Sequence, residues 1–238
     1  MYATNLEICT VPPDNTVIWR YVQLPSFLKL LQQRVLWFSR LTFLAATDPY
    51  EGRFTEATIN LLSKEFRKAP QHYPDPVMLA RQMETYIAPQ VCVNCWHKGQ
   101  TESAAMWKIY SGDDGIAIRS TFKDLKAAFD TEQRSVYIGN VRYLPVWEGG
   151  LNDLYAGVFC KRSSFAYEQE LRAIIISLPP APTDTPGTYV KVDASVLMNE
   201  IVLSPLVADW YIEVVRREME LHGFGDVVVK KSTLFDVP

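Results

Sequence analysis

Residues Cys160 to Leu178 read CKRSSFAYEQELRAIIISL, a polar segment that runs directly into branched apolar side chains. The stretch from Leu171 to Leu178 is the clearest strand signal in the chain, because β-branched residues favour extended backbone. Glu168 and Glu170 stand directly before it, so both carboxylates point to the same face if the strand already begins there. Two like charges beside a buried strand are costly, and the sequence therefore predicts a compensating cation nearby.

Lys161 and Arg172 are the candidate cations for this glutamate pair, since both lie in the same polar segment. Two interpretations of these four charged residues fit the sequence equally well. In one, these side chains form a salt-bridge network at the end of a strand. In the other, Glu168 and Glu170 are a functional pair. Carboxylates with perturbed pKa values occur in both settings.

The remaining segments place this strand in a sheet with helices grouped around it. Further strands are predicted at Thr16 to Val22, Val35 to Ser39, Val91 to Trp96, Gly115 to Ser120, Val136 to Leu144, Tyr189 to Val192, Glu200 to Ser204 and Val227 to Lys230. Helices are predicted at Ser26 to Gln33, Phe54 to Lys68, Asp75 to Ile87, Thr101 to Tyr110, Leu151 to Cys160 and Asp209 to Leu221. Because several neighbouring strands are joined by loops, the pattern favours an α+β fold with a mixed, mainly antiparallel sheet.

The bulk composition is typical of one globular domain over residues 1–238, with a proline-rich surface loop at 179–187. A formal net charge of −3 provides no extended basic track for a nucleic-acid backbone. The N-terminus lacks the pattern of a signal peptide, and no apolar run is long enough to span a bilayer. We therefore expect a cytoplasmic protein without a membrane partner, while its oligomeric state stays open.

The cysteines form neither a disulfide framework nor a metal site by their spacing. Cys92 and Cys95 are a C-x-x-C pair, but residues three apart on a predicted strand face opposite sides. The other candidate ligands are scattered and supply no second pair: Cys9, Cys160 and His72. We expect reduced core thiols and no bound metal.

Polar and aromatic residues gather at predicted strand ends and turns, which favours a polar cleft at one end of the sheet. Arg20 lies in the middle of an aromatic strand and must reach either solvent or such a cleft. The other members are Ser39 and Arg40 at the end of the second strand, Glu51 in the turn from Asp48 to Gly52, His97 after the third strand, Trp107 on the next helix, and Arg119 near the end of the GIAIRS strand. Taken singly, each is better explained by a structural role, as a cap, a turn former or a member of a solvated ion pair.

The same motifs resemble a known bacterial family. The ordered set comprises WRY (Trp19–Tyr21), FSR (Phe38–Arg40), DPYEG (Asp48–Gly52), NCWH (Asn94–His97), ESAAMWKIY (Glu102–Tyr110), GIAIRS (Gly115–Ser120), SFAYEQELRAI (Ser164–Ile174) and SPLVADW (Ser204–Trp210). From Trp19 to Trp210, nearly the whole chain, it resembles the bacterial family labelled domain of unknown function 2971. That family brings almost no established activity, so the resemblance indicates kinship more than function.

A second resemblance concerns the order Arg20, Ser39 and Glu168-x-Glu170, which is similar to the Arg–Ser–Glu arrangement of ADP-ribosyltransferases. It implies an ADP-ribosyltransferase-like fold and an enzyme that uses NAD as a substrate. In that family an arginine on the first strand binds NAD phosphate, a serine on a following strand steadies the site, and a Glu-x-Glu pair opens a later strand. The family's Ser-Thr-Ser run is here only Phe38-Ser39-Arg40.

The implied reaction is cleavage of the nicotinamide–ribose bond, during which the sugar develops oxocarbenium character that a fixed carboxylate stabilises. Glu170 would hold the ribose and face this cation, Glu168 would orient or deprotonate the acceptor, and Arg20 would bind the pyrophosphate. Tyr21 or Tyr50 would stack on nicotinamide. The chain has no glycine-rich dinucleotide fingerprint, so NAD would be consumed and would not serve as a dehydrogenase cofactor.

The sequence leaves the biological role and two further functions open. An NAD-consuming transferase or glycohydrolase fits a toxin or a phage-defence effector, whose acceptor, protein or nucleic acid, the sequence does not identify. The first alternative is a non-catalytic module that binds a nucleotide, a nucleic-acid end or a peptide. The second is a metal-dependent nuclease, which ranks last because loosely spaced carboxylates are common in acidic proteins. Its candidate residues are Asp48, Glu51, Lys161, Glu168 and Glu170.

Overall fold

The computed structural model describes residues 1–46, 48–68, 75–145, 154–177 and 185–237. Its main sheet has the strand order β11-β10-β4-β1-β3-β2-β9, and β8 joins β3 and β5. The strands are β1 (Val17–Val22), β2 (Val35–Arg40), β3 (Val91–Lys98), β4 (Ile116–Thr121), β5 (Tyr137–Asn140), β8 (Glu170–Ile176), β9 (Gly187–Lys191), β10 (Glu200–Leu203) and β11 (Val228–Lys231). Paired strands of this sheet run antiparallel except β10 and β11, which run parallel. This confirms the predicted α+β class with a mixed, mainly antiparallel sheet.

The sheet opens beside β3, and this opening positions the site. On one edge β3 pairs with β8 along most of its length. On the opposite edge it pairs with β2 near its start and with β1 near its end, so β1 and β2 separate in between. Side chains replace backbone partners there: Asn94 Nδ2 donates to the carbonyl oxygen of Trp37 (2.8 Å). Arg20 Nη1 donates to the carbonyl oxygen of Cys95 (2.5 Å), so polar groups are satisfied inside the sheet.

Two apolar cores lie on opposite faces of the sheet at β3. The larger core packs the sheet against α1 (Leu24–Gln33), α6 (Phe122–Ala128), α7 (Ala194–Leu197) and α8 (Asp209–Leu221). The smaller core includes α2 (Leu41–Leu44) and the short 3-10 helix η4 (Ala156–Phe159). The alternation of β3 explains this division, because Trp96 packs in the larger core and Val93 in the smaller one.

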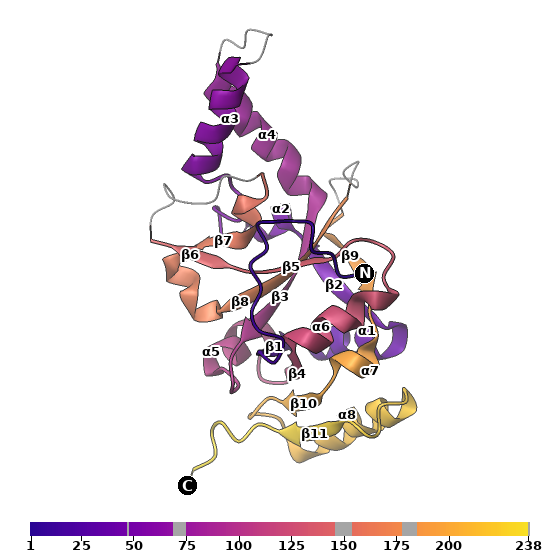
Figure 1. The fold of residues 1–238 in the computed structure, drawn as a ribbon. Coiled ribbons are helices and arrows are strands. Elements are labelled where there is room, and N and C mark those ends of the chain that lie inside the picture. Colours follow the sequence, from indigo (N-terminus) through magenta and orange to yellow (C-terminus); the bar gives the residue numbers. More distant parts are fainter. Residues whose placement is uncertain (47, 69–74, 146–153, 178–184, 238) are drawn as a thin grey trace.

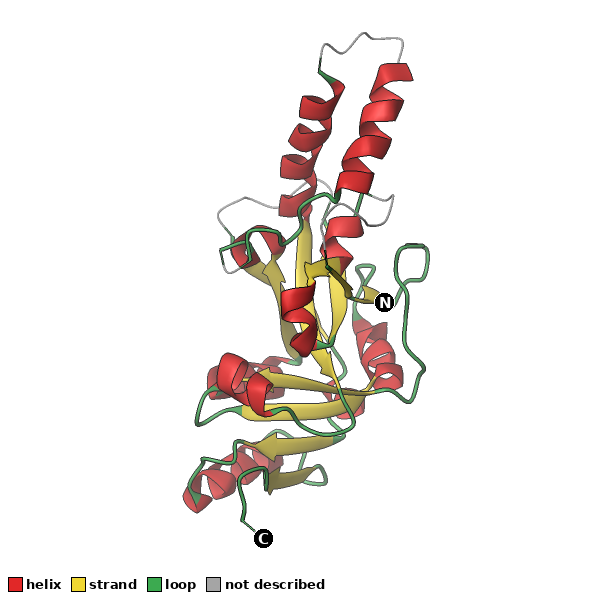
Figure 2. Ribbon diagram, turned by 90° about the vertical axis from the view of Figure 1, so that its left-hand side faces the viewer, coloured by secondary structure: helices red, strands yellow, loops and turns green. Residues whose placement is uncertain are grey.

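The helices α3 (Glu56–Lys68) and α4 (Pro76–Ile87) form a pair that projects away from the sheet (Figures 1 and 2). Asp75 caps α4 by accepting a hydrogen bond from Met78 N (2.9 Å), and Pro76 is its first residue, as the sequence predicts. At the base of the pair, Glu84 Oε2 accepts a hydrogen bond from Phe54 N (2.7 Å). Within the described ranges, no helix is both long and apolar enough to cross a membrane.

Some predicted elements differ in the structure. The strand predicted over Val136 to Leu144 is divided into β5 and β6 (Arg142–Leu144), and β6 pairs with β7 (Cys160–Arg162) in a separate two-stranded sheet. The division falls at Val141, whose N–H donates to the carbonyl oxygen of Glu170 (3.0 Å) where β8 begins. The helix predicted over Leu151 to Cys160 is only η4 in its described part, and residues 179–184 of the proline-rich loop lie outside the described residues.

The helix predicted over Thr101 to Tyr110 is shorter and partly of another kind. It consists of α5 (Ala104–Met106) followed by a single π-helical turn, η2 (Trp107–Ser111). Ser103 caps α5, because its side chain accepts a hydrogen bond from Met106 N (3.4 Å). Helical periodicity in the sequence does not distinguish an α-helical from a π-helical turn.

Candidate functional site

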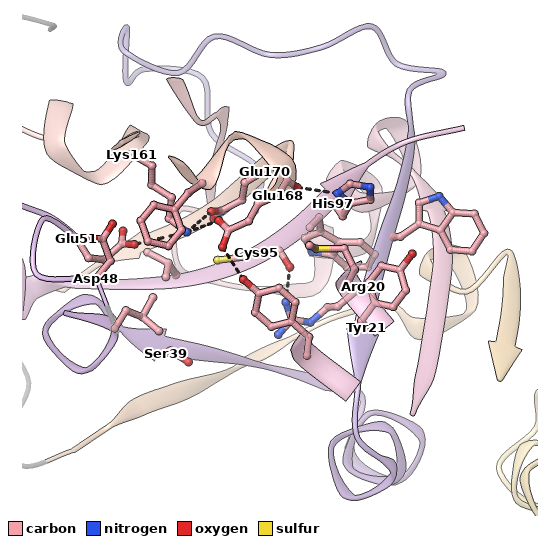
Figure 3. Close-up of a pocket in the computed structure, with 17 residues that line it drawn as sticks. Arg20, Tyr21, Ser39, Asp48, Glu51, Cys95, His97, Lys161, Glu168 and Glu170 are labelled. Carbon is pink, nitrogen blue, oxygen red and sulfur yellow. Dashed lines mark hydrogen bonds and ion pairs between the residues drawn. The ribbon is translucent and has the colours of Figure 1, made fainter. Parts of the chain in front are cut away.

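A cavity of about 320 Å³ lies at the opening of the sheet (Figure 3). Arg20 comes from β1 just after that strand leaves β3, and Ser39 comes from β2 where that strand joins β3. Glu170 begins β8 directly opposite His97 of β3, on the other edge. The cavity also contains further residues that the sequence singles out: Tyr21, Glu51, Lys161 and Glu168. The structure thus brings the predicted Arg, Ser and Glu-x-Glu residues to one hollow.

Arg20 is a cation without an ion pair among the described residues. Its guanidinium donates a hydrogen bond to Cys95 O, and its remaining donors lie at the cavity wall. Burial lowers the pKa of Arg20 from its ordinary value, because the charged form loses hydration. A half-buried guanidinium with free donors is suited to bind the oxygen atoms of an anionic ligand.

The two glutamates belong to different elements, separated by a strained residue. Glu168 ends the 3-10 helix η5 (Ser163–Glu168), and Glu170 begins β8. Between them Gln169 has φ 42° and ψ 47°, the left-handed region that side chains other than glycine rarely adopt. The strand therefore begins two residues after Glu168 and does not include it. Both carboxylates nevertheless reach the same cation, Lys161, at 2.5 Å for Glu168 and 3.0 Å for Glu170.

Lys161 and Arg172 hold three buried carboxylates in one network. Arg172 is completely buried, and its Nε lies 2.6 Å from Glu170 Oε1 while its Nη1 lies 2.6 Å from Glu51 Oε1. Lys161 on β7 lies 3.7 Å from Glu51 in addition to the glutamate pair. With all groups ionised, three carboxylates face two cations, so the network carries one excess negative charge.

The network keeps Glu170 ionised. Burial alone would raise the pKa of Glu170, but Arg172 and Lys161 outweigh it and hold that pKa well below the usual range. For Lys161, burial acts to lower the pKa, yet Glu170 and Glu51 raise it above its ordinary value. Both groups are therefore charged at neutral pH, which is the state required of a carboxylate that faces a developing cation.

The turn from Asp48 to Gly52 supplies a second carboxylate to the cavity wall. Arg162 Nη2 lies 2.9 Å from Asp48 Oδ1, which also accepts a hydrogen bond from Tyr50 N (3.1 Å). Among the described residues, the buried Asp48 Oδ2 has no hydrogen-bond partner. The guanidinium of Arg162 lies over the ring of Tyr50, 4.7 Å from its centroid, so this tyrosine packs on the turn.

Aromatic residues form the opposite wall. Tyr21 meets Trp107 edge-to-face with ring centroids 5.0 Å apart, and its hydroxyl oxygen accepts a hydrogen bond from Ser103 N (2.7 Å). His97 Nδ1 lies 2.7 Å from the carbonyl oxygen of Glu168, which can only accept, so Nδ1 carries a hydrogen. These contacts fix the Tyr21 and His97 rings beside the cavity.

A second cavity of about 610 Å³ adjoins the first. The two share Arg20, Tyr21 and Tyr110 as lining residues. In the second cavity Trp37 and Tyr189 meet edge-to-face at 4.9 Å between centroids. A cation–π contact from Lys29 to the Tyr189 ring (4.9 Å) adds a positive charge to the same wall. Arg20 therefore stands between a carboxylate-rich cavity and an aromatic one.

Several residues predicted for the cleft do not line the first cavity: Arg40, Tyr50, Trp107, Arg119 and Arg172. Arg40 is buried and donates to the carbonyl oxygens of Thr185 (2.7 Å) and Pro89 (2.5 Å). Arg119 lies 3.9 Å from Glu200 and over the Trp19 ring. Arg172 and Trp107 stand behind lining residues and hold them in place.

Other lining residues were not singled out by the sequence as site residues. They include Cys95, Tyr110 and Phe165. Asp48 also lines the cavity, and the sequence named it only as a candidate of the nuclease alternative. Tyr110 carried none, because its approach to Glu168 depends on the π-helical turn and on a contact 58 residues away in sequence.

The cysteines are free thiols in the structure, with Cys92 and Cys160 buried. Burial raises the pKa of Cys95 and Cys160, the latter to about 11, so both are protonated at neutral pH. Within the described parts of the chain, no group of His, Cys, Asp and Glu side chains is arranged to hold a metal ion. No protein-family model matches the chain, and the curated proteins compared with it include none of significantly similar sequence.

Proposed function

We propose that this protein cleaves the nicotinamide–ribose bond of NAD, as an ADP-ribosyltransferase or an NAD glycohydrolase. One observation carries the proposal: Arg20, Ser39, Glu168 and Glu170 line a single cavity although they come from distant parts of the chain. The order of these residues in the sequence does not by itself show whether they meet. The toxin or defence role that the sequence suggests is part of the same proposal.

The two adjoining cavities fit the two halves of a dinucleotide. NAD has a pyrophosphate in its middle, and Arg20, with free guanidinium donors and no ion pair among the described residues, lies where the cavities meet. The aromatic cavity beside Trp37 and Tyr189 offers ring faces and edges to adenine. The first cavity then receives nicotinamide and its ribose, with Tyr21 at the wall.

Glu170 would stabilise the sugar cation. When the bond from C1′ to the nicotinamide nitrogen breaks, its electron pair neutralises the pyridinium ring and positive charge develops on the ribose. Glu170 is kept ionised by Arg172 and Lys161 and would face that charge without reorganisation. Water or an acceptor hydroxyl then bonds to C1′ and gives up its proton. Glu168 would orient that acceptor and receive the proton.

Release of nicotinamide from NAD tests the proposal. We expect the purified protein to release it, and Glu170→Gln to lower the rate by about 100-fold or more, because a neutral amide does not stabilise the sugar cation. Glu168→Gln is a second variant, since Glu170→Gln also removes a partner of Arg172. Glu213→Gln, at a side chain 76% exposed on α8, is the matched control and should leave the rate unchanged. A folded wild-type protein that binds NAD without releasing nicotinamide would contradict the enzymatic proposal.

A non-catalytic nucleotide-binding module is the second candidate, and one observation favours it. Glu170 is bonded to Arg172 and Lys161 and is only 3% exposed, which reduces the charge that it presents to a ligand. That module would bind nucleotide with the same Arg20 and show no turnover. A divalent-metal nuclease is less favoured, because Lys161 and Arg172 already pair with Glu51, Glu168 and Glu170, which would hold the metal.

A further inference from the structure

Tyr110 lies in a backbone conformation that is rare in proteins. It is part of the π-helical turn η2, which Gly112 closes by donating its N–H to the carbonyl oxygen of Trp107 (3.1 Å). Gly112 has φ 69°, which favours glycine. Single π-helical turns are frequent at functional sites because they redirect a side chain that an α-helix would point elsewhere.

The redirected side chain connects three parts of the site. The Tyr110 hydroxyl donates to Glu168 Oε1 (2.8 Å), and the residue lines both cavities. The residue as a whole is 47% exposed, so the contact with a buried carboxylate is not explained by packing in an apolar core. A half-exposed tyrosine whose hydroxyl reaches a buried glutamate is placed to meet a ligand on its ring and to hold the glutamate with its oxygen.

Glu168 has two side-chain partners of different kinds. Lys161 lies at Oε2 and is shared with Glu170 and Glu51, whereas the hydroxyl of Tyr110 serves Glu168 at Oε1. Burial and the neighbouring Glu168 raise the pKa of Tyr110, so it remains a protonated donor at neutral pH. Loss of the Tyr110 hydroxyl therefore leaves Glu168 Oε1 without this donor, while the contact of Oε2 with Lys161 and the Lys161–Arg172 network stay intact.

We propose that Tyr110 is a positioning residue: its hydroxyl aims Glu168 at the acceptor, and its ring forms the wall shared by the two cavities. The inference rests on the proposed function, in which Glu168 orients the acceptor. It assigns Tyr110 a role in turnover through its hydroxyl and a role in binding through its ring. The two roles are separable by substitution.

Steady-state kinetics of nicotinamide release separate them. Tyr110→Phe keeps the ring, so we expect kcat to fall about tenfold or more, as for a lost hydrogen bond to a charged group, with KM unchanged. Tyr110→Ala removes the shared wall as well, and KM should rise about tenfold. Tyr86→Phe, at an exposed tyrosine near the C-terminal end of α4, is the matched control for loss of a tyrosine hydroxyl. If Tyr110→Phe turns over at the wild-type rate, the inference is wrong while the proposed function stands.

A second measurement does not depend on NAD. In protein labelled with ¹³C at the glutamate carboxyl carbons, the Glu168 signal is assigned by its loss in Glu168→Gln. We expect Tyr110→Phe to move that signal, because the carboxylate loses a hydrogen bond at Oε1, and Tyr86→Phe to leave it in place. If the wild-type protein releases no nicotinamide, the proposed function fails, and the carboxyl signal alone decides whether Tyr110 holds Glu168. A Glu168 signal that does not move in Tyr110→Phe would overturn the positioning role.

Discussion

Arg172 illustrates at the residue scale how charge is accommodated inside this protein. Its guanidinium has no exposed surface and contacts Glu170, Glu51 and the carbonyl oxygen of Val158. A buried ion pair has a desolvation cost similar to its Coulombic gain, so its formation adds little stability. Removing one partner is different, because it leaves the other charge buried without compensation.

We therefore expect Arg172→Met to lower the free energy of unfolding at pH 7 by about 3–5 kcal/mol. Urea unfolding followed by tryptophan fluorescence measures this, with Arg217→Met, at a side chain 68% exposed, as the matched control. The sign of the pH dependence follows from Glu170. The pKa of Glu170 is lower in the folded protein than in the unfolded chain, where it lies near 4.5. Ionised Glu170 therefore stabilises the folded protein at pH values above the unfolded pKa. This contribution is lost as the pH falls through the folded pKa.

In Arg172→Met the pKa of Glu170 rises, because burial then acts against fewer cations. Glu170 becomes protonated at a higher pH, and the stability difference from wild type should shrink as pH is lowered from 7 toward 4. A difference that is small at pH 7, or that grows toward acid pH, would contradict this account of the network.

Much of the residue-level site was predictable from sequence, and the remainder depends on tertiary geometry. Glu168, Glu170 and Lys161 stand out because charges beside an apolar strand need partners. Arg20 stands out as a charge inside an aromatic strand. Tyr110 could not be predicted, since nothing in its neighbourhood indicates a π-helical turn.

At the scale of elements, the turn from Asp48 to Gly52 and the next residue, Arg53, pack closely against the backbone of η4. A β-carbon added at Gly157 would overlap the carbonyl oxygen of Arg53, so only glycine allows this approach. The next residue, Val158, accepts a hydrogen bond from Arg172 through its carbonyl oxygen (2.5 Å). The contact thus keeps Glu51, two residues before Arg53, within reach of Arg172.

We expect Gly157→Ala to force these backbones apart and to lower the free energy of unfolding by about 1–3 kcal/mol. Gly225→Ala is the control, because the nearest atom to its added β-carbon would be Glu220 Cγ at 3.6 Å, an ordinary contact. Thermal unfolding of both variants checks the difference. Equal stability of the two would show that the approach of η4 to the turn does not constrain the fold.

The elements themselves were largely predictable, except where the partner decides the structure. Capped helices such as α4 and apolar strands such as β8 are indicated by their local sequence, and both are present in the structure. The segment from Val136 to Leu144 reads as one strand, but β5 and β6 pair in different sheets. Local propensity does not encode such a change of partner.

At the scale of the whole molecule, the opening between β1 and β2 places a cavity within the sheet. The class of sheet followed from the sequence, whereas the opening follows from pairing between segments more than fifty residues apart. It exposes the carbonyl oxygen of Cys95 to Arg20 and places that guanidinium between two cavities. Our central claim is that these cavities take one anionic ligand, NAD, across Arg20.

Isothermal titration calorimetry with NAD tests this claim most directly, using wild type, Arg20→Gln and the exposed control Arg217→Gln. We predict saturable binding by wild type in the range of about 1 μM to 1 mM that is typical of enzyme substrates. Arg217→Gln should bind equally, and Arg20→Gln at least tenfold more weakly, because a charged hydrogen-bond donor is lost. Absence of NAD binding by the folded wild-type protein, or equal binding by Arg20→Gln, would contradict the account.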